Sequence, residues 1–218
     1  IHELEGAVQR ICQPRLLLCG GVDPTSEAGI TADVRYAERL GAQCYTITTA
    51  VTYQNAQKFS GFMAMTDEQI KLQFAALSQL VAPTVVKIGL VTSLQQLHLL
   101  CQQVRNYFPK SLIVWDPILC TSSGYHLIPD ADVIALQEAA ASVDLLLPNA
   151  YESMQLLGNL APEKAALQWN TTIVCKGESL MAEEILDRAY TPNGEIVESQ
   201  YPMVGIDLHG TGCLYATT

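Results

Sequence analysis

The stretch H-G-T-G-C at positions 209–213 places two glycines, a hydroxyl and a thiol within five residues. Gly210 and Gly212 flank Thr211, and Cys213 follows directly. Glycines permit a tight turn in which successive backbone N–H groups point to one place, and a helix starting there adds the positive end of its dipole. Such a place holds a phosphate and lowers the pKa of a thiol. The stretch therefore predicts a phosphate-binding turn, with a flexible end and an incidental buried cysteine as the alternative.

Glycines and polar residues also follow four predicted strands at their carboxyl ends. In chain order these are Gly20–Asp23 after 15–19, Asp116 after 112–115, Asn149 and Glu152 after 145–147, and Lys176 with Gly177 after 172–175. In open parallel sheets, ligands bind in the crevice at this edge. We therefore expect these residues and the stretch 209–213 to form one nucleotide or phosphate site.

The elements that must position these residues alternate between strand and helix. We expect strands at 15–19, 43–51, 85–89, 112–115, 145–147 and 172–175, and helices at 27–40, 66–80, 93–107, 131–141, 151–157 and 162–169. Several strands are apolar at nearly every position, which indicates a parallel sheet covered on both faces by helices. An Asn-Gly turn at 193–194, between strands at 186–191 and 196–201, predicts an antiparallel hairpin at one edge.

Composition narrows the class of protein. The 218 residues are 49% hydrophobic and 16% charged, which fits one folded α/β domain. A net charge of −10 argues against a nucleic-acid surface, and no apolar run reaches the roughly 18 residues of a membrane helix. The first residues do not resemble a signal peptide. Seven scattered cysteines without a C-x-x-C pair argue against zinc and are typical of free thiols in a reducing compartment, so we expect a cytoplasmic protein.

The ordered set of motifs resembles the hydroxymethylpyrimidine and phosphomethylpyrimidine kinases of thiamine biosynthesis, which have a ribokinase-like fold. The resemblance runs from residue 15 to residue 218. It is carried by G-G-V-D-P-T-S-E-A-G-I-T-A-D at 20–33, Q-N at 54–55, K-I-G-L at 87–90, D-P-I-L at 116–119, S-S-G at 122–124, P-N-A-Y-E at 148–152, K-G at 176–177 and H-G-T-G-C at 209–213.

For the fold, the resemblance implies an α/β, ribokinase-like three-layer α/β/α sandwich with a mostly parallel central sheet and an antiparallel hairpin at one edge. We expect residues 1–218 to form a single kinase domain, with the C-terminal helices of the family missing from this sequence. A homodimer is expected by the same resemblance, without nucleic-acid or membrane partners.

For the activity, the resemblance implies an ATP- and Mg²⁺-dependent kinase. The hydroxymethyl group of 4-amino-5-hydroxymethyl-2-methylpyrimidine would attack the γ-phosphate of ATP, and whether the product monophosphate is phosphorylated again stays open. The N–H groups of Gly210, Thr211, Gly212 and Cys213 would surround the transferring phosphoryl group, which is the charge stabilisation that phosphoryl transfer needs. Cys213 would help to deprotonate the hydroxyl.

The resemblance also implies the substrate-binding residues. Gly21 would let the backbone approach the ring, and Asp33 would hydrogen-bond the hydroxymethyl or amino group. Gln54 would read the pyrimidine edge, because an amide both donates and accepts hydrogen bonds. Leu90 and Ile118 would belong to an apolar wall. From the residues alone, Asp33 could equally be a solvent-facing helix residue and Gln54 part of a turn.

At the phosphate end, Lys176 resembles the lysine that contacts the ATP phosphates, and Asp116 resembles the acidic residue behind the phosphate channel. Asn149 and Glu152 resemble an N-x-x-E element that arranges Mg²⁺, a cation suited to carboxylate oxygens. Asn149 could also cap the following helix, and the two roles are compatible. Lys87 ends an apolar strand and is interpreted as a structural ion-pair partner.

The sequence departs from the family pattern at several positions. Thr25–Gly29 reads T-S-E-A-G where the family has S-G-G-A-G, Leu90 replaces a methionine, and Glu178 replaces a glycine. These changes leave two alternatives open: a pyridoxal or pyridoxine kinase of the same fold, and a non-catalytic relative that binds a vitamin precursor or nucleotide as a sensor. A dinucleotide-dependent dehydrogenase is disfavoured, since no G-x-G-x-x-G follows the first strand.

Overall fold

The computed structural model describes residues 13–202, except 56, 122, 130, 182 and 183. The predicted phosphate-binding turn, with Gly210, Thr211, Gly212 and Cys213, therefore lies outside the described residues. Within the described part of the chain, no helix is long and apolar enough to cross a membrane.

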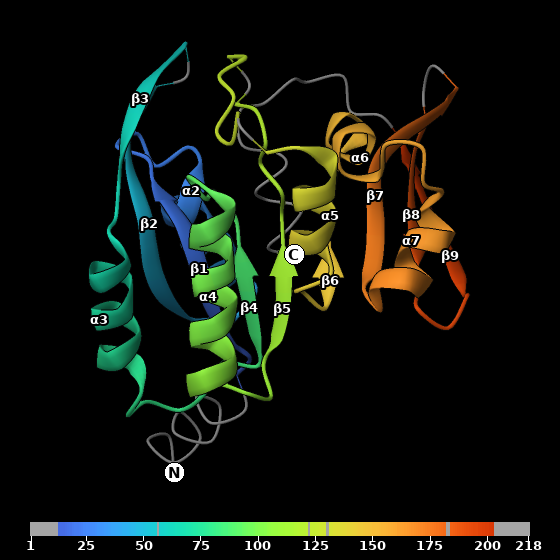
Figure 1. The fold of residues 1–218 in the computed structure, drawn as a ribbon. Helices are drawn as coiled ribbons and strands as arrows, with labels where there is room; N and C mark the ends of the chain where they lie inside the picture. The colour runs from blue at the N-terminus through green and yellow to red at the C-terminus, as the bar shows by residue number, and fades with distance from the viewer. Residues whose placement is uncertain (1–12, 56, 122, 130, 182–183, 203–218) are drawn as a thin grey trace.

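Strands and helices alternate along the chain much as the sequence predicts (Figure 1). The strands are β1 (Arg15–Val22), β2 (Gln43–Asn55), β3 (Lys58–Ala64), β4 (Val85–Ile88), β5 (Leu112–Trp115), β6 (Leu145–Leu146), β7 (Thr172–Met181), β8 (Glu184–Tyr190) and β9 (Ile196–Pro202). The helices are α2 (Gly29–Arg39), α3 (Asp67–Leu77), α4 (Leu94–Tyr107), α5 (Val133–Ala140), α6 (Ala150–Leu157) and α7 (Pro162–Trp169).

All described strands join one mixed sheet in the order β3-β2-β1-β4-β5-β6-β7-β8-β9. Six neighbouring strands of this sheet run parallel to one another: β2, β1, β4, β5, β6 and β7. Strands β8 and β9 form the expected antiparallel hairpin at one edge. The α/β fold with a mostly parallel sheet is thus confirmed. The other edge carries a second antiparallel pair, β2–β3, which the sequence analysis did not predict.

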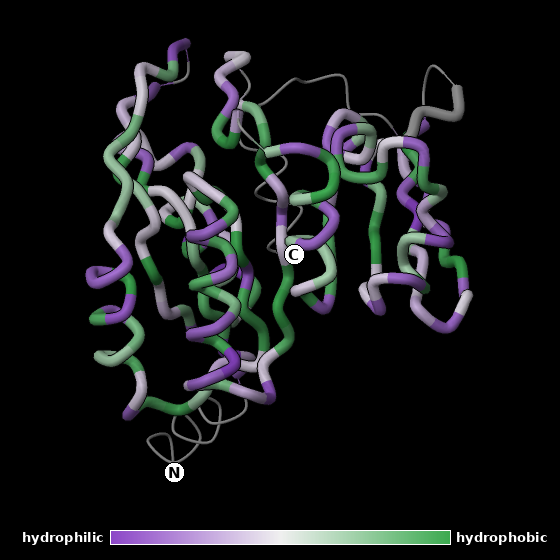
Figure 2. Tube along the Cα trace, viewed as in Figure 1, coloured by the Kyte–Doolittle hydropathy of each residue, from purple (hydrophilic) through white to green (hydrophobic). Residues whose placement is uncertain are grey.

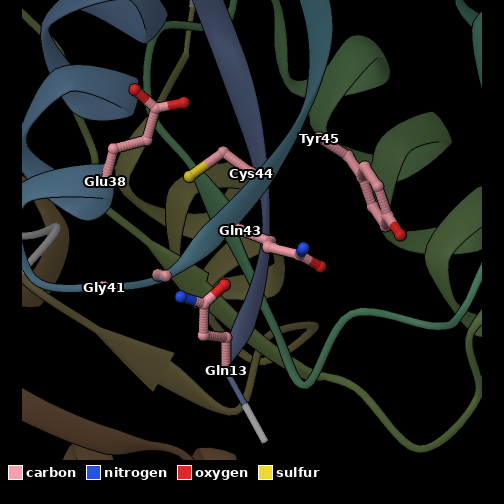
Figure 3. Close-up of a pocket in the computed structure, with 7 residues that line it drawn as sticks. Gln13, Glu38, Gly41, Gln43, Cys44 and Tyr45 are labelled. Carbon is pink, nitrogen blue, oxygen red and sulfur yellow. The ribbon is translucent and has the colours of Figure 1, made fainter. Parts of the chain in front are cut away.

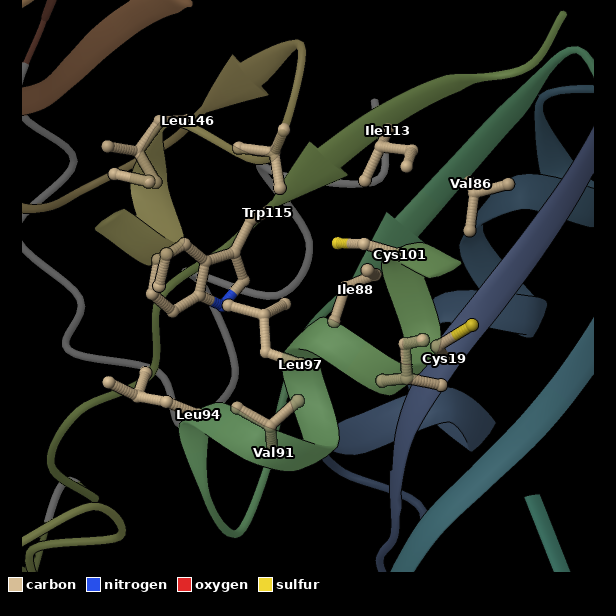
Figure 4. Close-up of a cluster of buried hydrophobic side chains, with 14 of the residues drawn as sticks. Cys19, Val86, Ile88, Val91, Leu94, Leu97, Cys101, Ile113, Trp115 and Leu146 are labelled. Atoms are coloured by element: carbon tan, nitrogen blue, oxygen red, sulfur yellow. The ribbon is translucent and has the colours of Figure 1, made fainter. Parts of the chain in front are cut away.

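One face of the sheet forms the main core with α3 to α7 (Figure 4). Val86 and Ile88 of β4 alternate with residues that face the other way, and Trp115 of β5 is fully buried among leucines. Figure 2 shows the hydrophobic residues gathered along the central strands, with hydrophilic residues on the outer helix surfaces. Burial of this face supplies the main stabilisation, because stabilisation grows with the apolar area removed from water.

Helix α2 lies behind the sheet in Figure 1, on the opposite face. Its residues Ile30 and Ala37 are buried there. Lys87 of β4 is also buried, at a register position between Val86 and Ile88. Buried residues thus occupy both faces of the central strands, as expected for a parallel sheet between helix layers.

Candidate active site

The carboxyl end of β1 leads into a tightly organised loop before α2. The buried Asp23 carboxylate accepts hydrogen bonds from the backbone N–H groups of Thr25, Glu27 and Ala28 at 2.9–3.1 Å, and from the Thr25 hydroxyl. One carboxylate therefore satisfies three backbone donors of the loop. This explains how the loop keeps a defined shape although two of the family's glycines are replaced.

Two glycines fix how closely this loop approaches the sheet. Gly29 has φ +63°, and a Cβ at this position would lie 2.2 Å from the carbonyl oxygen of Gly21. A Cβ on Gly21 would lie 3.2 Å from the Thr52 side chain and 3.4 Å from that of Leu90. Both positions therefore lack room for a side chain, and the buried Gly21 packs directly against the side chains of Leu90 and Thr52.

Four of the five predicted substrate residues belong to one region at this edge. Leu90 follows β4 and packs in a small apolar cluster with Ala50 and Leu127, against which Ile118 is partly buried. Gln54, half-buried near the end of β2, pairs with Phe59 of β3. With Gly21 beside Leu90, the structure brings Gly21, Leu90 and Ile118 together and places Gln54 on the adjoining hairpin.

Asp33 lies elsewhere, in α2, and forms a buried ion pair with Lys87 of β4. Its Oδ1 is 2.8 Å from the lysine Nζ, and the two side chains are only 6% and 5% exposed. The solvent-facing alternative for Asp33 is therefore wrong. The pairing predicted for Lys87 is confirmed, and the substrate contact of Asp33 stays a prediction.

Asp116 and Lys176 form a second buried ion pair at the carboxyl edge. The distance from Lys176 Nζ to Asp116 Oδ1 is 2.7 Å, and these side chains are 10% and 4% exposed. Lys176 also forms a parallel bridge with Asn149, just beyond β6. The pair therefore joins the middle of β7 to the end of β5, across the short strand β6.

Asn149 and Glu152 begin helix α6 with a capping box. The Asn149 side chain accepts from the Glu152 N–H at 2.9 Å, and the Glu152 carboxylate accepts from the Asn149 N–H at 2.8 Å. The capping role foreseen for Asn149 is confirmed. Burial raises the pKa of Glu152 to about 7, the Asn149 N–H opposes this shift, and the nearby Asp116 adds to it.

This edge offers oxygen ligands for a divalent cation. Mg²⁺ is usually held by one or two carboxylates together with substrate phosphates. Asp116 and Glu152 are close enough to raise the Glu152 pKa by repulsion, which a cation between them would offset. Within the part of the chain that the structure describes, no cluster of three or more His, Cys, Asp or Glu could hold a metal alone. The residues fit a cation shared with a phosphate.

Sequence reasoning missed three aromatic residues at this edge. Phe59 and Phe62 of β3 and Tyr125 of the loop after β5 contact one another. One sequence feature does mark this hairpin: Phe59 and Phe62 lie on either side of Gly61, shortly after a segment rich in Thr and Val. It was overlooked because β3 itself was not predicted.

A pocket lies at the opposite, amino end of the sheet (Figure 3). It is lined by Gln13, Glu38, Gly41, Ala42, Gln43, Cys44 and Tyr45. Cys44 is half-buried there, and burial raises its pKa to about 11, with Glu38 contributing further. The pocket contains none of the predicted site residues, so the candidate active site remains the carboxyl edge.

The chain is similar to known proteins both in sequence and in fold. The chain is similar to the probable bifunctional thiamine biosynthetic enzyme of Oryza sativa, with 26% identity over 97% of this chain and 40% of that protein. The chain spans less than half the length of the first curated relatives that it matches. The fold of the Staphylococcus aureus pyridoxal kinase in complex with AMP-PCP is also similar, with a TM-score of 0.77, 21% identity, and coverage of 94% of this chain and 79% of that one.

A solved structure of a phosphomethylpyrimidine kinase from Clostridium difficile 630 has a TM-score of 0.71 to this chain, with 25% identity. The match covers 88% of this chain and 85% of that one. The family model for phosphomethylpyrimidine kinase matches residues 23–218. These residues include every motif that carries the resemblance, except that the motif at 20–33 begins three residues earlier. The chain belongs to the phosphomethylpyrimidine kinase family.

Proposed function

We propose that this protein is an ATP- and Mg²⁺-dependent kinase that phosphorylates the hydroxymethyl group of 4-amino-5-hydroxymethyl-2-methylpyrimidine and then the resulting monophosphate. One observation carries the proposal. A small apolar wall, formed by Ala50, Leu90 and Leu127, lies at the same sheet edge as the Asp116–Lys176 pair and Glu152. An aromatic heterocycle and a polyphosphate need these two kinds of surface side by side.

At the substrate end, the ring would lie against Leu90 and Ile118, with its edge near the Gln54 amide. Gly21 would lie beneath the wall, where a side chain would displace Thr52 and Leu90 and so change the shape of the ring site. This arrangement holds the hydroxymethyl oxygen in place for attack, and positioning lowers the barrier of a two-substrate reaction.

At the phosphate end, Lys176 supplies positive charge and is itself held by Asp116, which keeps its side chain at the sheet edge. Asp116 and Glu152 would bind Mg²⁺, which supplies neutralisation of the phosphate charge. In the transfer, the hydroxymethyl oxygen forms a bond to the γ-phosphorus and the bond to ADP breaks. The hydroxyl proton would pass to the thiolate of Cys213, in the turn predicted to surround the phosphoryl group.

Measurement of ATP consumption with Mg²⁺ tests the proposal, using hydroxymethylpyrimidine, its monophosphate and pyridoxal as acceptors. We expect turnover with both pyrimidines and a loss of at least about 100-fold in Cys213→Ala, because general-base catalysis contributes roughly 10²–10⁴-fold. Cys44→Ala, at the far end of the sheet, is the matched control. Preference for pyridoxal would keep the mechanism and change the substrate. Pyrimidine binding without turnover would favour a sensor.

We also infer a cytoplasmic homodimer, supported by the family resemblance and by the free cysteines of the described residues. Sedimentation equilibrium of the purified protein checks the oligomeric state. A monomer at micromolar concentration would contradict the dimer without affecting the proposed activity.

A further inference from the structure

Three aromatic rings meet above the predicted substrate wall and come from two separate segments. Phe59 and Phe62 stand on β3, and Tyr125 stands on the loop after β5. The Tyr125 ring centroid is 5.0 Å from that of Phe59, at an interplanar angle of 43°, and 6.3 Å from that of Phe62, at 89°. These are the tilted and edge-to-face arrangements that aromatic pairs prefer.

The loop that carries Tyr125 is an ordered turn. Leu127 donates its N–H to the Leu119 carbonyl at 3.0 Å, and Cys120 forms an antiparallel bridge with His126. At the tip, the Tyr125 N–H donates to the Thr121 hydroxyl at 3.0 Å. These bonds fix the backbone at Tyr125, whereas the residue is 44% exposed, so its ring can turn without breaking them.

The β2–β3 hairpin, which carries Phe59 and Phe62, is also attached to the candidate site. The Thr52 hydroxyl of β2 donates to the Val22 carbonyl at 2.9 Å, which ties the hairpin to the end of β1. Phe62 pairs with Thr52 and Phe59 pairs with Gln54 in the β2–β3 register. Because paired residues point to the same face, Phe59 shares a face with the amide expected to read the substrate edge.

The rings also rest on the apolar wall itself. Phe59 and Phe62 pack against the cluster of Ala50, Leu90 and Leu127, as does Ile118. Phe59 and Phe62 therefore lie against the wall that would contact the substrate ring, and Tyr125 reaches this place through its contacts with both rings. A planar, electron-poor heterocycle can replace ring–ring contacts with stacking contacts of the same kind.

We propose that Phe59, Phe62 and Tyr125 form an aromatic clamp that selects planar aromatic heterocycles by stacking on them. This inference rests on the proposed function, since it assigns residues to recognition of that substrate. The hydroxyl of Tyr125 has no part in it, so the phenyl ring alone must suffice.

Isothermal titration of hydroxymethylpyrimidine, without ATP, into wild-type protein and three variants tests the clamp. Tyr125→Leu keeps an apolar side chain and removes the ring, and we expect its Kd to rise roughly tenfold, within the range measured when a stacking aromatic residue is removed. Tyr125→Phe should restore the wild-type Kd to within about twofold. Tyr107→Leu is the matched control, because Tyr107 is 40% exposed and stacks on Phe74 of α3, away from the site.

In steady-state kinetics, the loss in Tyr125→Leu should fall on KM more than on kcat. Equal Kd values for Tyr125→Leu and Tyr107→Leu, or a wild-type protein that binds no aromatic heterocycle, would overturn the clamp. A weaker Kd in Tyr125→Leu that Tyr125→Phe restores, in a protein that does not consume ATP, would support the clamp while the proposed kinase activity fails. Pyridoxal binding with the same variant pattern would support the clamp for a different substrate.

Discussion

At the scale of single residues, the candidate site depends on buried carboxylates that each have a nearby charge. Asp33 pairs with Lys87 and Asp116 pairs with Lys176, all with side chains at most 10% exposed. Removing one partner of a buried ion pair costs more than replacing both, because the remaining charge stays in a poorly solvated place. The pairs therefore constrain which substitutions the site edge tolerates.

The Lys87–Asp33 pair gives the first prediction. Lys87→Met should lower the free energy of unfolding by about 3–5 kcal/mol, since the Asp33 carboxylate loses its positive neighbour. The double variant Lys87→Met/Asp33→Leu should recover a large part of this loss. Urea unfolding followed by tryptophan fluorescence measures both. If the double variant is as unstable as the sum of the single variants, the two residues are not coupled.

Glu152 gives a prediction for pH. Its pKa of about 7 in the folded protein lies above the ordinary value of 4.5, because burial disfavours the charged form. As the pH rises, the Glu152 carboxyl therefore loses its proton in the unfolded chain before it does so in the folded protein. Glu152 contributes its full stabilisation below about pH 4.5, and this stabilisation is lost as the pH rises through about 7. Glu152→Gln keeps a side chain that can complete the capping box and removes this loss.

The measurement is urea unfolding of wild type and Glu152→Gln without metal between pH 5 and 8. The variant should gain stability relative to wild type as the pH rises, by on the order of 2–3 kcal/mol at pH 8. A difference that stays constant with pH would show that Glu152 titrates normally. In the kinase assay the same variant should lose activity, because a neutral amide is a poorer Mg²⁺ ligand than a carboxylate.

Much of the arrangement at this sheet edge was predictable, although the roles of its residues stay predictions. Gly20, Asp116 and Lys176 are recognisable because each follows a run of apolar residues. The Asp33–Lys87 pair was only half foreseen, since a sequence shows that a buried lysine needs a partner but not which one. Phe59, Phe62 and Tyr125 were missed because aromatic residues are common in cores and carry no motif.

At the scale of elements, the loop between β1 and α2 depends on one glycine. Gly29 has φ +63° and lies against the Gly21 carbonyl, where a Cβ would be 2.2 Å from the oxygen. Gly29→Ala should therefore lower the free energy of unfolding by about 3 kcal/mol or more. The new side chain would strain the left-handed backbone and would also push the Gly21 carbonyl out of place. Gly41→Ala is the control, because Gly41 has φ +82° with nothing within 4 Å of its Cβ position.

Thermal unfolding of the two variants separates these effects. Gly41→Ala should lower the free energy of unfolding by only about 1–2 kcal/mol, which is the strain of a left-handed backbone at alanine. It should leave substrate binding unchanged. Gly29→Ala should also weaken pyrimidine binding, because the displaced loop borders Gly21. Equal losses of stability in the two variants would mean that the close approach to Gly21 contributes nothing.

Element positions were predicted best where local signals are strong. Helix α3 begins within one residue of its predicted start, with Thr66 and Gln69 in reciprocal hydrogen bonds, and β5 matches its prediction residue for residue. Strand β3 was missed because Gly61 interrupts it and its residues are mostly exposed, so no alternating pattern marks it. Its formation depends on pairing with β2, a tertiary contact that local sequence does not encode.

At the scale of the whole molecule, Cys19 is a probe of global opening. It is 1% exposed in the central strand β1, and burial raises the pKa of its thiol far above the ordinary value. Labelling by iodoacetamide should therefore require unfolding of the sheet. Peptide mass spectrometry should show Cys19 labelling at a rate that follows urea stability, and the half-buried Cys44 labelling faster. Rapid labelling of Cys19 in native buffer would mean that the sheet opens locally.

The order of strands in the sheet has a consequence for synthesis on the ribosome. Each strand, from β2 to β9, pairs with a neighbour that precedes it in the chain, so it meets a finished template as it emerges. The apolar wall and its aromatic rings are complete once Leu127 has left the exit tunnel, whereas the Asp116–Lys176 pair must wait for Lys176. At roughly 5–20 residues per second, this interval lasts roughly 3–10 s. If the proposed function holds, a nascent chain in this interval gains stability from the pyrimidine before it can bind ATP.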